Sequence, residues 1–286
     1  MGNLFAMPCR NAPSRNVLGL ATGDMNDMAD IEGNFVWYEL LTTAIGAAAD
    51  FYVNVVGFTA GDMVVDNVAY KILSAGERPT AAIVDTVAYS DGSGALSGWV
   101  GYLAVKDVDA VVAMMHELAA VVRLAPCDAA GIGRFAIVGD PQGAAIGLFA
   151  SSSGSASRTE ADSTLNGHVA WHELYTGNPQ EALSFYRHAF GWRSVQTIDM
   201  GAAGPYLIFS TGDEPAGGIA RRPQEISQSL WSPFFRVNDI EAAAHRVVAE
   251  GGKVFDELRE VPDGDFTLRC FDRQGAVFAL VGPKAS

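Results

Sequence analysis

Two stretches of the chain decide its fold, because one is a copy of the other. Residues 35–58 read FVWYELLTTAIGAAADFYVNVVGF, and residues 169–192 read VAWHELYTGNPQEALSFYRHAFGW. Aligned 134 residues apart and without gaps, they share a W-x-E-L-x-T motif, a Phe-Tyr pair and a glycine followed by an aromatic residue. A gap-free match of this length indicates an internal repeat, which has to be recognised before any single element is interpreted.

A second pair of stretches repeats within the same frame. Residues 99–110 read WVGYLAVKDVDA, and residues 231–242 read WSPFFRVNDIEA. The ends match as well, with GDPQGAAIGLF at 139–149 and FDRQGAVFALV at 271–281. The chain is therefore predicted to contain four modules, arranged as one pair followed by a second pair.

Within each module the pattern predicts one strand, one helix and then further strands. Residues 44–56 carry apolar side chains at helical spacing, which is typical of a helix with one buried face. In the second copy, Asn178, Pro179 and Glu181 have the residue types of an N-cap, a first and a third helical position. Gly191, like its counterpart in the first copy, fits the left-handed residue that ends such a helix.

The sequence thus predicts an α+β fold of four tandem βαβββ modules, forming two cupped mixed β-sheets with the helices outside. Residues 1–32 are expected to be a flexible N-terminal extension. One domain is predicted over residues 33–151 and a second over 167–284. The serine-rich residues 152–166 between them are predicted to be a linker. The concave inner face of each cup is the expected place for a ligand.

Composition narrows the expected partners and location. Acidic residues exceed basic ones by 33 to 19, so the formal charge is −14. Such a charge repels nucleic acid and anionic lipid, and no apolar run is long enough to predict a membrane span. Three cysteines without CxxC spacing fit a reducing cytoplasm. The expected partner is a small molecule, bound by a monomer or a homodimer.

The W-x-E-L motif, the Phe-Tyr pair, the glycine-aromatic pair and the D-P-x-G turn together resemble the vicinal oxygen chelate superfamily. This superfamily includes glyoxalase I, bleomycin resistance proteins and extradiol dioxygenases, and the two-domain glyoxalase-like subgroup of actinobacteria is the most similar. The resemblance spans residues 33–283 and implies the cupped fold. It does not imply a reaction, because the superfamily hosts many chemistries.

The resemblance also implies where metal ligands would lie, namely on the first and last strands of the modules. Those positions hold Trp37, Trp171, Gly147 and Ala279, and in the second and fourth modules they fall near Val100 and Ser232. Divalent ions prefer several carboxylate, imidazole or thiolate ligands that converge on one point. We therefore expect no cofactor and no metal, with a divalent metal as the less favoured alternative.

Glu39 and Glu173 are the candidate catalytic residues. Alternate residues of a strand share a face, so each glutamate should point the same way as Trp37 or Trp171. A carboxyl group among aromatic rings has a raised pKa, which suits it to proton transfer. The alternative is that each glutamate only accepts structural hydrogen bonds.

Aromatic residues of the modules are the candidate ligand-binding residues, and filling of the protein core is the alternative for each. The set is Trp37, Trp99, Trp171, Trp231, Tyr70 and Tyr206. Aromatic rings of this kind can stack on flat organic ligands. His168 and His172, four residues apart on one strand, leave a two-histidine metal site open.

The function predicted from these features is a glyoxalase/bleomycin-resistance-like protein that binds a small organic molecule in Trp/Glu-lined cups without the family metal. The alternative is a lyase, isomerase or dioxygenase-like enzyme that uses a pocket glutamate or a non-standard metal site. A third reading is an interaction role in which the pockets are vestigial.

Overall fold

The computed structural model describes residues 32–65, 67–89, 97–152, 165–262 and 264–285. The predicted extension over residues 1–32 therefore lies outside the described residues except for Glu32. Most of the predicted linker also lies outside them, over residues 153–164.

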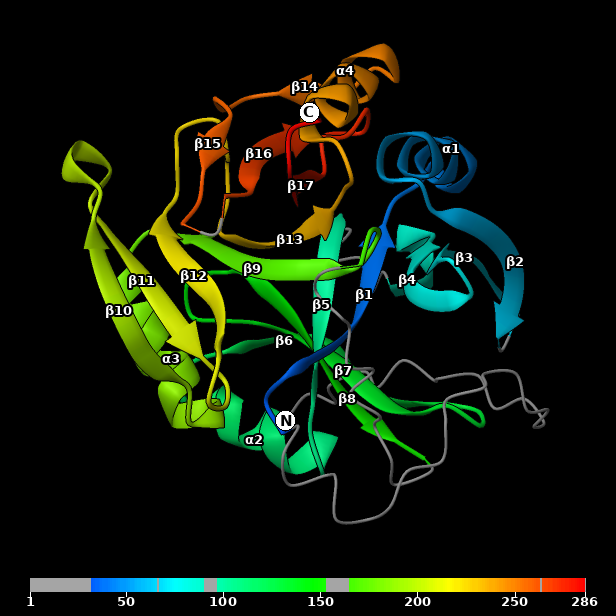
Figure 1. Ribbon diagram of the computed structural model, residues 1–286. Coiled ribbons are helices and arrows are strands. Elements are labelled where there is room, and N and C mark those ends of the chain that lie inside the picture. The colour runs from blue at the N-terminus through cyan, green and yellow to red at the C-terminus, as the bar shows by residue number, and fades with distance from the viewer. Residues whose placement is uncertain (1–31, 66, 90–96, 153–164, 263, 286) are drawn as a thin grey trace.

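The first half of the chain forms two modules that follow the predicted order (Figure 1). The first module comprises β1 (Phe35–Leu41), α1 (Ile45–Val56), β2 (Thr59–Val65), β3 (Val68–Ala75) and β4 (Arg78–Val84). A short 3-10 helix, η2 (Thr86–Tyr89), follows it. The second module comprises β5 (Gly98–Ala104), α2 (Val108–Glu117), β6 (Val121–Ala129), β7 (Gly133–Gly139) and β8 (Ala145–Ser151).

The second half repeats this order with small changes. Its first module comprises β9 (Val169–Thr176), α3 (Pro179–Phe190), β10 (Arg193–Asp199), η3 (Gly201–Ala203), β11 (Pro205–Ser210) and β12 (Pro215–Arg221). Its second module comprises β13 (Leu230–Arg236), α4 (Ile240–Ala249), β14 (Lys253–Val254), β15 (Arg259–Glu260), β16 (Phe266–Phe271) and β17 (Val277–Gly282). The short strands β14 and β15 stand where the first half has the long strand β6.

Each half forms one curled mixed sheet, which confirms the predicted fold class. The strand order is β2-β3-β4-β1-β5-β8-β7-β6 in the first sheet and β10-β11-β12-β9-β13-β17-β16-β14 in the second, where β15 also pairs with β16. The first and last strands of a module pair in parallel, and the two modules join through the antiparallel pairs β1–β5 and β9–β13. The first strands of all four modules therefore lie at the centres of the two sheets.

The helix ends follow the chemistry that their sequences predict. Asn178 is the N-cap of α3, where its side chain accepts a hydrogen bond from the Glu181 backbone N–H, and Pro179 opens the helix. Gly57 and Gly191 adopt left-handed conformations at the C-caps of α1 and α3. These caps set the points at which the chain turns from helix back into the sheet.

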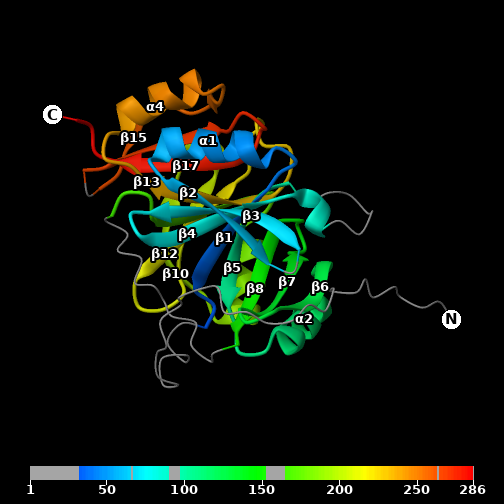
Figure 2. The same ribbon diagram turned by 90° about the vertical axis from the view of Figure 1, so that its right-hand side faces the viewer.

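The outer faces of the two sheets pack against each other, an arrangement that the repeat alone did not predict. One apolar cluster joins side chains of α1, such as Tyr52, to Phe235 of β13 and Phe278 of β17. Its counterpart joins Met115 of α2 to Tyr186 of α3. Helix α1 lies beside α4 in both views (Figures 1 and 2). Each module thus shares its core with a module of the other half, so we expect both halves to unfold together.

A hydrogen-bonded triad crosses this interface twice. Trp99 Nε1 donates to the Tyr52 hydroxyl at 2.8 Å, and that hydroxyl donates to Asp272 Oδ2 of the other half at 3.2 Å. The repeat supplies the same triad with Trp231, Tyr186 and Asp140, at 2.9 and 3.1 Å. The turn near the end of each half therefore holds the first helix of the opposite half.

Tyr38 and His172, which occupy the same position in the two copies, meet each other at the interface. The Tyr38 hydroxyl lies 2.5 Å from His172 Nε2, while His172 Nδ1 lies 2.8 Å from the Ala216 carbonyl oxygen. The carbonyl can only accept, so Nδ1 carries the proton and Nε2 accepts from Tyr38. The imidazole also stacks on Phe35, with ring centroids 3.9 Å apart. Burial lowers the pKa of His172 to about 4.

We expect acid to weaken the protein through His172. The neutral imidazole is favoured in the fold, so its contribution is complete above the ordinary histidine pKa of 6.5 and is lost as pH falls towards 4. Between these values the loss is roughly 3 kcal/mol of unfolding free energy. His172→Gln removes the titrating group. Denaturant unfolding at pH 7 and pH 4.5 should show wild type losing more stability than the variant, and equal losses would contradict the assignment.

Candidate functional site

The inner face of the first sheet, called the first cup here, surrounds Glu39. This carboxylate is 8% exposed, and its Oε2 accepts hydrogen bonds from the Tyr102 hydroxyl at 2.7 Å and the Tyr89 hydroxyl at 3.1 Å. Tyr70 lies 3.2 Å from the Tyr89 hydroxyl, and the Trp37 side chain also donates to the carboxylate. A chain of phenols therefore leads from β3 across η2 to a buried carboxyl group on β1.

No cation balances this carboxyl group within the part of the chain that the structure describes. Its partners there are phenols and an indole, all uncharged donors. Burial raises the pKa of Glu39, and the hydrogen bonds from Tyr102, Tyr89 and Trp37 counter this shift only in part. Glu39 therefore holds its proton to higher pH than an exposed glutamate, which is the property needed for proton transfer near neutrality.

Gly147 makes room for Tyr102 in the first cup. These residues are direct neighbours in the parallel pair β5–β8, and a Cβ atom on Gly147 would lie 2.3 Å from the Tyr102 ring. A larger side chain, including a glutamate, would displace the phenol that donates to Glu39. At the last-strand position that the family resemblance assigns to a metal ligand, the chain thus accommodates an aromatic ring.

The inner face of the second sheet, called the second cup here, surrounds Glu173 in a different way. Glu173 is 1% exposed and binds Arg269 through both oxygens, with Arg269 Nε and NH2 at 3.2 and 3.0 Å. The Tyr175 hydroxyl donates to the same carboxylate at 2.6 Å, and Tyr206 is a further donor. Arg269 NH1 also donates to Asp256. The second cup therefore has an ion-pair network where the first has uncharged donors.

Arg269 reaches Glu173 across the floor of the cup. The two residues lie on β16 and β9, and β17 and β13 lie between these strands in the sheet. Ala279 is the register neighbour of Arg269, and Ser232 is the register neighbour of Glu173. Both are small, which leaves space for the guanidinium. Burial alone would lower the pKa of Arg269, but the interactions with Glu173, Tyr175 and Asp256 together raise it, so Arg269 stays cationic.

Most of the aromatic residues singled out from the sequence lie on the inner faces. Trp37 and Tyr70 belong to the aromatic lining of the first cup. In the second cup, Trp171 donates through Nε1 to the Tyr206 hydroxyl at 2.9 Å. These four residues lie beside Glu39 or Glu173, so the geometry brings together most of the predicted site residues, while their roles in binding or catalysis stay predictions.

Trp99 and Trp231 are exceptions, because the structure places them in the cores between the two halves rather than in the cups. Both are almost fully buried there and donate to Tyr52 and Tyr186. The expectation that they line the pockets is wrong for a simple reason. Strand neighbours face opposite ways, and Trp99 stands next to Val100, whose side chain does face the cup.

Sequence reasoning missed the partners of the two glutamates. Tyr102 and Tyr175 could have been predicted, because alternate residues of a strand share a face and the same rule assigned Trp37 to a cup. Arg269 had a signal as well, since a charged residue between buried Leu268 and Cys270 must face the opposite side of the strand. Tyr89 lies on the short 3-10 helix η2, which sequence reasoning did not predict.

The residues at the family's metal-ligand positions do not fit a metal ion. Those positions hold Trp37, Val100 and Gly147 in the first cup, and Trp171, Ser232 and Ala279 in the second. Among the described residues, no group of three or more His, Cys, Asp or Glu side chains could hold a metal ion. The two-histidine alternative meets a further obstacle, because both ring nitrogens of His172 already have hydrogen-bond partners.

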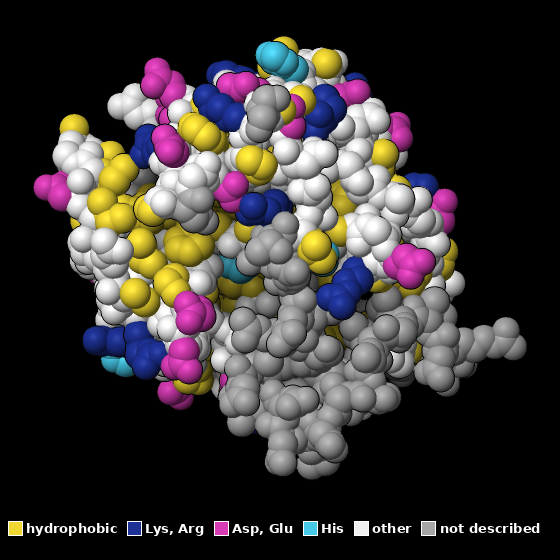
Figure 3. Space-filling view, in the orientation of Figure 1, with side chains coloured by type: hydrophobic (Ala, Val, Ile, Leu, Met, Phe, Trp, Pro, Cys, Tyr) yellow, Lys and Arg dark blue, Asp and Glu magenta, His cyan; other side chains and the backbone are white. Residues whose placement is uncertain are grey.

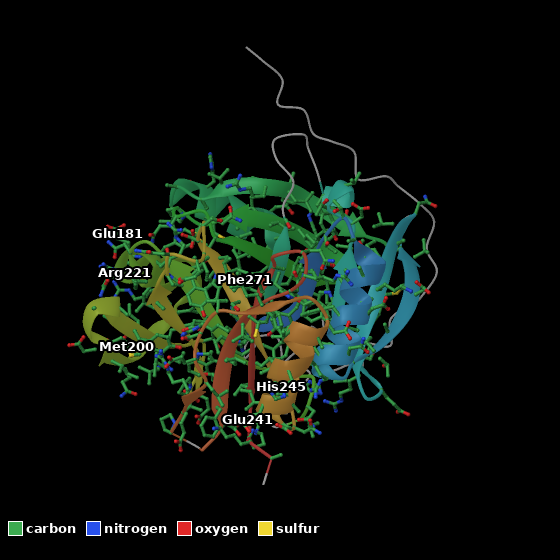
Figure 4. All side chains as sticks on the ribbon, turned by 90° about the horizontal axis from the view of Figure 1, so that it is seen from above. Glu181, Met200, Arg221, Glu241, His245 and Phe271 are labelled. Carbon is green, nitrogen blue, oxygen red and sulfur yellow. The ribbon has the colours of Figure 1, made fainter. Side chains whose placement is uncertain are left out.

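Two surface features lie outside the glutamate centres. Hydrophobic side chains gather over β10–β12, where Val195, Ile198 and Met200 are exposed (Figure 3). A groove of about 490 Å³ lies beside α4 and is lined by Glu241, His245 and Asp256 among others. From above, Glu241 and His245 lie along α4, apart from Met200 (Figure 4). Asp256 lines this groove and also accepts a hydrogen bond from Arg269, so it connects the groove to the second cup.

Tandem βαβββ modules that curl into two cups define a class of proteins, and comparisons with known structures agree with it. A Mn(II)-bound glyoxalase from Novosphingobium aromaticivorans aligns with a TM-score of 0.59 and 15% identity over 89% of this chain and 83% of its own. Homoprotocatechuate 2,3-dioxygenase from Brevibacterium fuscum aligns with a TM-score of 0.60 and 13% identity over 90% and 82%. At such identities the likeness concerns the fold alone.

Sequence comparison identifies the family. A model of the Glyoxalase/Bleomycin resistance protein/Dioxygenase superfamily matches residues 167–280. "Putative glyoxylase CFP32" of Mycobacterium tuberculosis is 31% identical over 261 residues, covering 88% of this chain and 95% of the relative. "Anthracycline biosynthesis protein DnrV" of Streptomyces peucetius is 30% identical over 262 residues, covering 86% and 91%. The chain belongs to this superfamily. In its described part, no helix has the length and apolar character needed to cross a membrane.

Proposed function

We propose that this protein binds a small organic molecule at the inner faces of its cups and does so without the family metal. The observation that carries the proposal is the environment of Glu39, a buried carboxyl group under aromatic rings that has no cation beside it among the described residues. A metal-binding cup would need carboxylate or imidazole ligands at positions that hold Trp37 and Gly147. The aromatic surroundings favour a flat organic ligand instead.

The relatives support a small-molecule role in general terms. One is named as a glyoxylase and another as a protein of anthracycline biosynthesis. Both align over most of their length with this chain, so the alignment spans both of its halves. A cytoplasmic location accompanies the proposal, since three cysteines without CxxC spacing are typical of a reducing compartment.

A second candidate function is favoured by the pKa of Glu39. Because that pKa is raised by burial, the carboxyl group could exchange a proton with a bound substrate, as a lyase or isomerase requires. The phenol chain from Tyr70 through Tyr89 would connect it towards the edge of the cup. Glu173 suits this role less, because Arg269 and Tyr175 already occupy its oxygens.

The test uses metal-stripped protein and the hemithioacetal of methylglyoxal and glutathione. We expect that adding Ni²⁺, Zn²⁺ or Fe²⁺ creates no turnover, because the cups lack the ligands to hold these ions. Tryptophan fluorescence in the same samples reports binding through Trp37 and Trp171. Turnover that depends on metal would contradict the proposal.

The Glu39→Gln variant, tested in the same assay, separates the two candidate functions. Should any metal-independent turnover accompany binding, loss of a general base is expected to reduce it by about a hundredfold or more. Glu173→Gln is the matched control, since it changes the same residue type at the repeated position. Turnover that survives both substitutions removes the carboxylate-base mechanism, whereas binding without turnover favours the binding protein.

A further inference from the structure

We propose that the guanidinium of Arg269 takes the place of the family metal ion in the second cup and binds the carbonyl oxygen of an uncharged small molecule. This inference rests on the proposed function, because it concerns what the second cup recognises. It is carried by the position of Arg269, by its unused N–H groups and by a buried hydroxyl group beside it.

The Arg269 side chain starts beside Ala279 and ends on Glu173, which is the register neighbour of Ser232. Ala279 and Ser232 stand at family metal-ligand positions and carry no ligand atoms suited to a metal. A permanent cation from the chain itself therefore lies across the part of the cup where the family resemblance places a metal cation.

The Arg269 guanidinium is held in place, but not all of its N–H groups are used in hydrogen bonds. Glu173 and Asp256 hold it from two directions and together engage three of its N–H groups. An arginine side chain has about five N–H donors, so one on each terminal nitrogen stays available. The Arg269 side chain is 22% exposed, so it is not sealed off from solvent. Such an arrangement can donate to one further oxygen without losing its anchors.

Ser232 supplies the second, independent observation. It is 1% exposed, and its hydroxyl group has no hydrogen-bond partner in the part of the chain that the structure describes. Strand alternation points it into the cup, because its neighbour Trp231 packs in the core between the halves. A buried hydroxyl without a partner weakens a fold, so its presence beside Glu173 indicates a group kept for a ligand.

Charge selects an uncharged ligand oxygen. Arg269 carries one positive charge, while its partners Glu173 and Asp256 carry two negative charges. A carboxylate ligand would add a third negative charge to this cluster, whereas a carbonyl oxygen accepts from the guanidinium without that repulsion. A fixed cation on a carbonyl oxygen also polarises the C=O bond, which is the service that a metal ion provides as a Lewis acid.

The first cup cannot provide the same site. Aligned through the repeat, the position of Arg269 corresponds to Ile137, which belongs to the apolar lining of that cup. Among the described residues, the hydrogen-bond donors around Glu39 are accordingly uncharged. The two cups are therefore specialised, and carbonyl recognition by a guanidinium is confined to the second.

The experiment uses three probes of similar size with the full-length, metal-stripped protein. Acetophenone offers an uncharged carbonyl, alpha-methylbenzyl alcohol is its reduced counterpart, and benzoate carries a carboxylate. Their phenyl ring can stack on Trp171 or Tyr206 at the inner face. Ligand-observed NMR titration gives the three affinities. We expect acetophenone to bind more tightly than the other two.

Variants then locate the carbonyl contact. Because Arg269→Gln alone would leave buried Glu173 without its cation, the working variant is the double substitution Glu173→Gln with Arg269→Gln. This double variant should bind acetophenone about tenfold more weakly, which is the loss of affinity expected for a hydrogen bond from a charged donor. Arg269→Lys, which keeps the charge but not the planar fork, should fall in between. Arg134→Gln is the control, since Arg134 binds Asp109 and Asp128 away from the cups.

Ser232→Ala and Thr176→Val form a second matched pair. Both remove a buried hydroxyl without a partner, but Thr176 lies on the face of β9 opposite to Glu173. Each should raise the unfolding temperature by about 2 °C, because an unsatisfied group is lost. Only Ser232→Ala should lower the affinity for acetophenone, by about threefold.

The outcomes separate the two proposals. Equal acetophenone affinity in wild type and the double variant, or tighter binding of benzoate, overturns the role of Arg269 while binding in the cups stands. If none of the three probes binds to the metal-stripped protein, the carbonyl site is overturned and the proposed binding function loses its support as well. A circular dichroism spectrum of each variant confirms that the fold is retained, and Arg269→Lys decides the matter if the double variant is unfolded.

Discussion

Arg269→Gln alone is expected to destabilise the protein by about 3–5 kcal/mol. The substitution leaves the Glu173 carboxylate, which is 1% exposed, without the cation that binds both of its oxygens. An uncompensated buried charge has a cost of this size, whereas removal of both partners is often close to neutral. Urea unfolding should therefore show a large loss for the single variant and a much smaller one, about 1–2 kcal/mol, when Glu173→Gln is added.

The comparison between the single and double variants measures how strongly Arg269 and Glu173 are coupled. If both lose the same free energy, the ion pair does not couple the two residues and the loss comes from packing of the long arginine side chain. Arg134→Gln serves as the surface control, since its carboxylate partners Asp109 and Asp128 are largely exposed. That substitution should change the free energy of unfolding by about 1 kcal/mol or less.

Trp99→Ala is expected to lower the free energy of unfolding by about 3–5 kcal/mol, a loss typical of a large aromatic side chain removed from a core. Trp99 packs between the two halves and donates to Tyr52, which in turn holds Asp272 of the other half. Trp37→Ala provides the contrast, because Trp37 lies half-buried on the inner face. It should cost about 1–2 kcal/mol and instead reduce ligand binding.

Denaturant unfolding followed by circular dichroism measures both variants, and ligand titration of the same samples measures binding. Trp99→Ala is expected to unfold in one transition, because each half shares its core with the other. Two separate transitions would show that the halves are independent. A weak effect of Trp99→Ala together with a severe one for Trp37→Ala would reverse the assignment of the two faces.

Strand alternation explains both the successes and the errors of sequence-based prediction here. It placed Glu39 with Trp37, and Glu173 with Trp171, on the same faces, which are the inner faces of the cups. Alternation shows which residues of a strand share a face, but not which face lines the cup. A residue can therefore be assigned to a cup only when another residue of the same strand is already known to face it. For Trp99 the reference was its neighbour Val100, and treating both as cup residues ignored the opposite facing of adjacent side chains.

Strand alternation can show which residues face a cup, but it does not show which of them reach each carboxyl group. Glu39 and Glu173 are identical in their motifs, yet Tyr89 and Tyr102 surround one while Arg269 binds the other. Tyr89 lies on η2, while Tyr102 and Arg269 lie on other strands, so the fold brings together residues that are far apart in the chain. The repeat predicted two similar centres, and the structure shows two different electrostatic environments.

The sequence by itself determined the repeat, the order of strands and helices in each module, the helix caps at Asn178 and Gly191, and the facing of the two glutamates. These are local properties, set by backbone preference and by the periods of helix and strand. Only the tertiary structure decided that the outer faces of the two halves share their cores, and that a guanidinium lies beside Glu173 whereas the described partners of Glu39 are uncharged. The physical reason is that packing and electrostatic pairing depend on side chains from distant strands, whose proximity is created by the closure of the sheets.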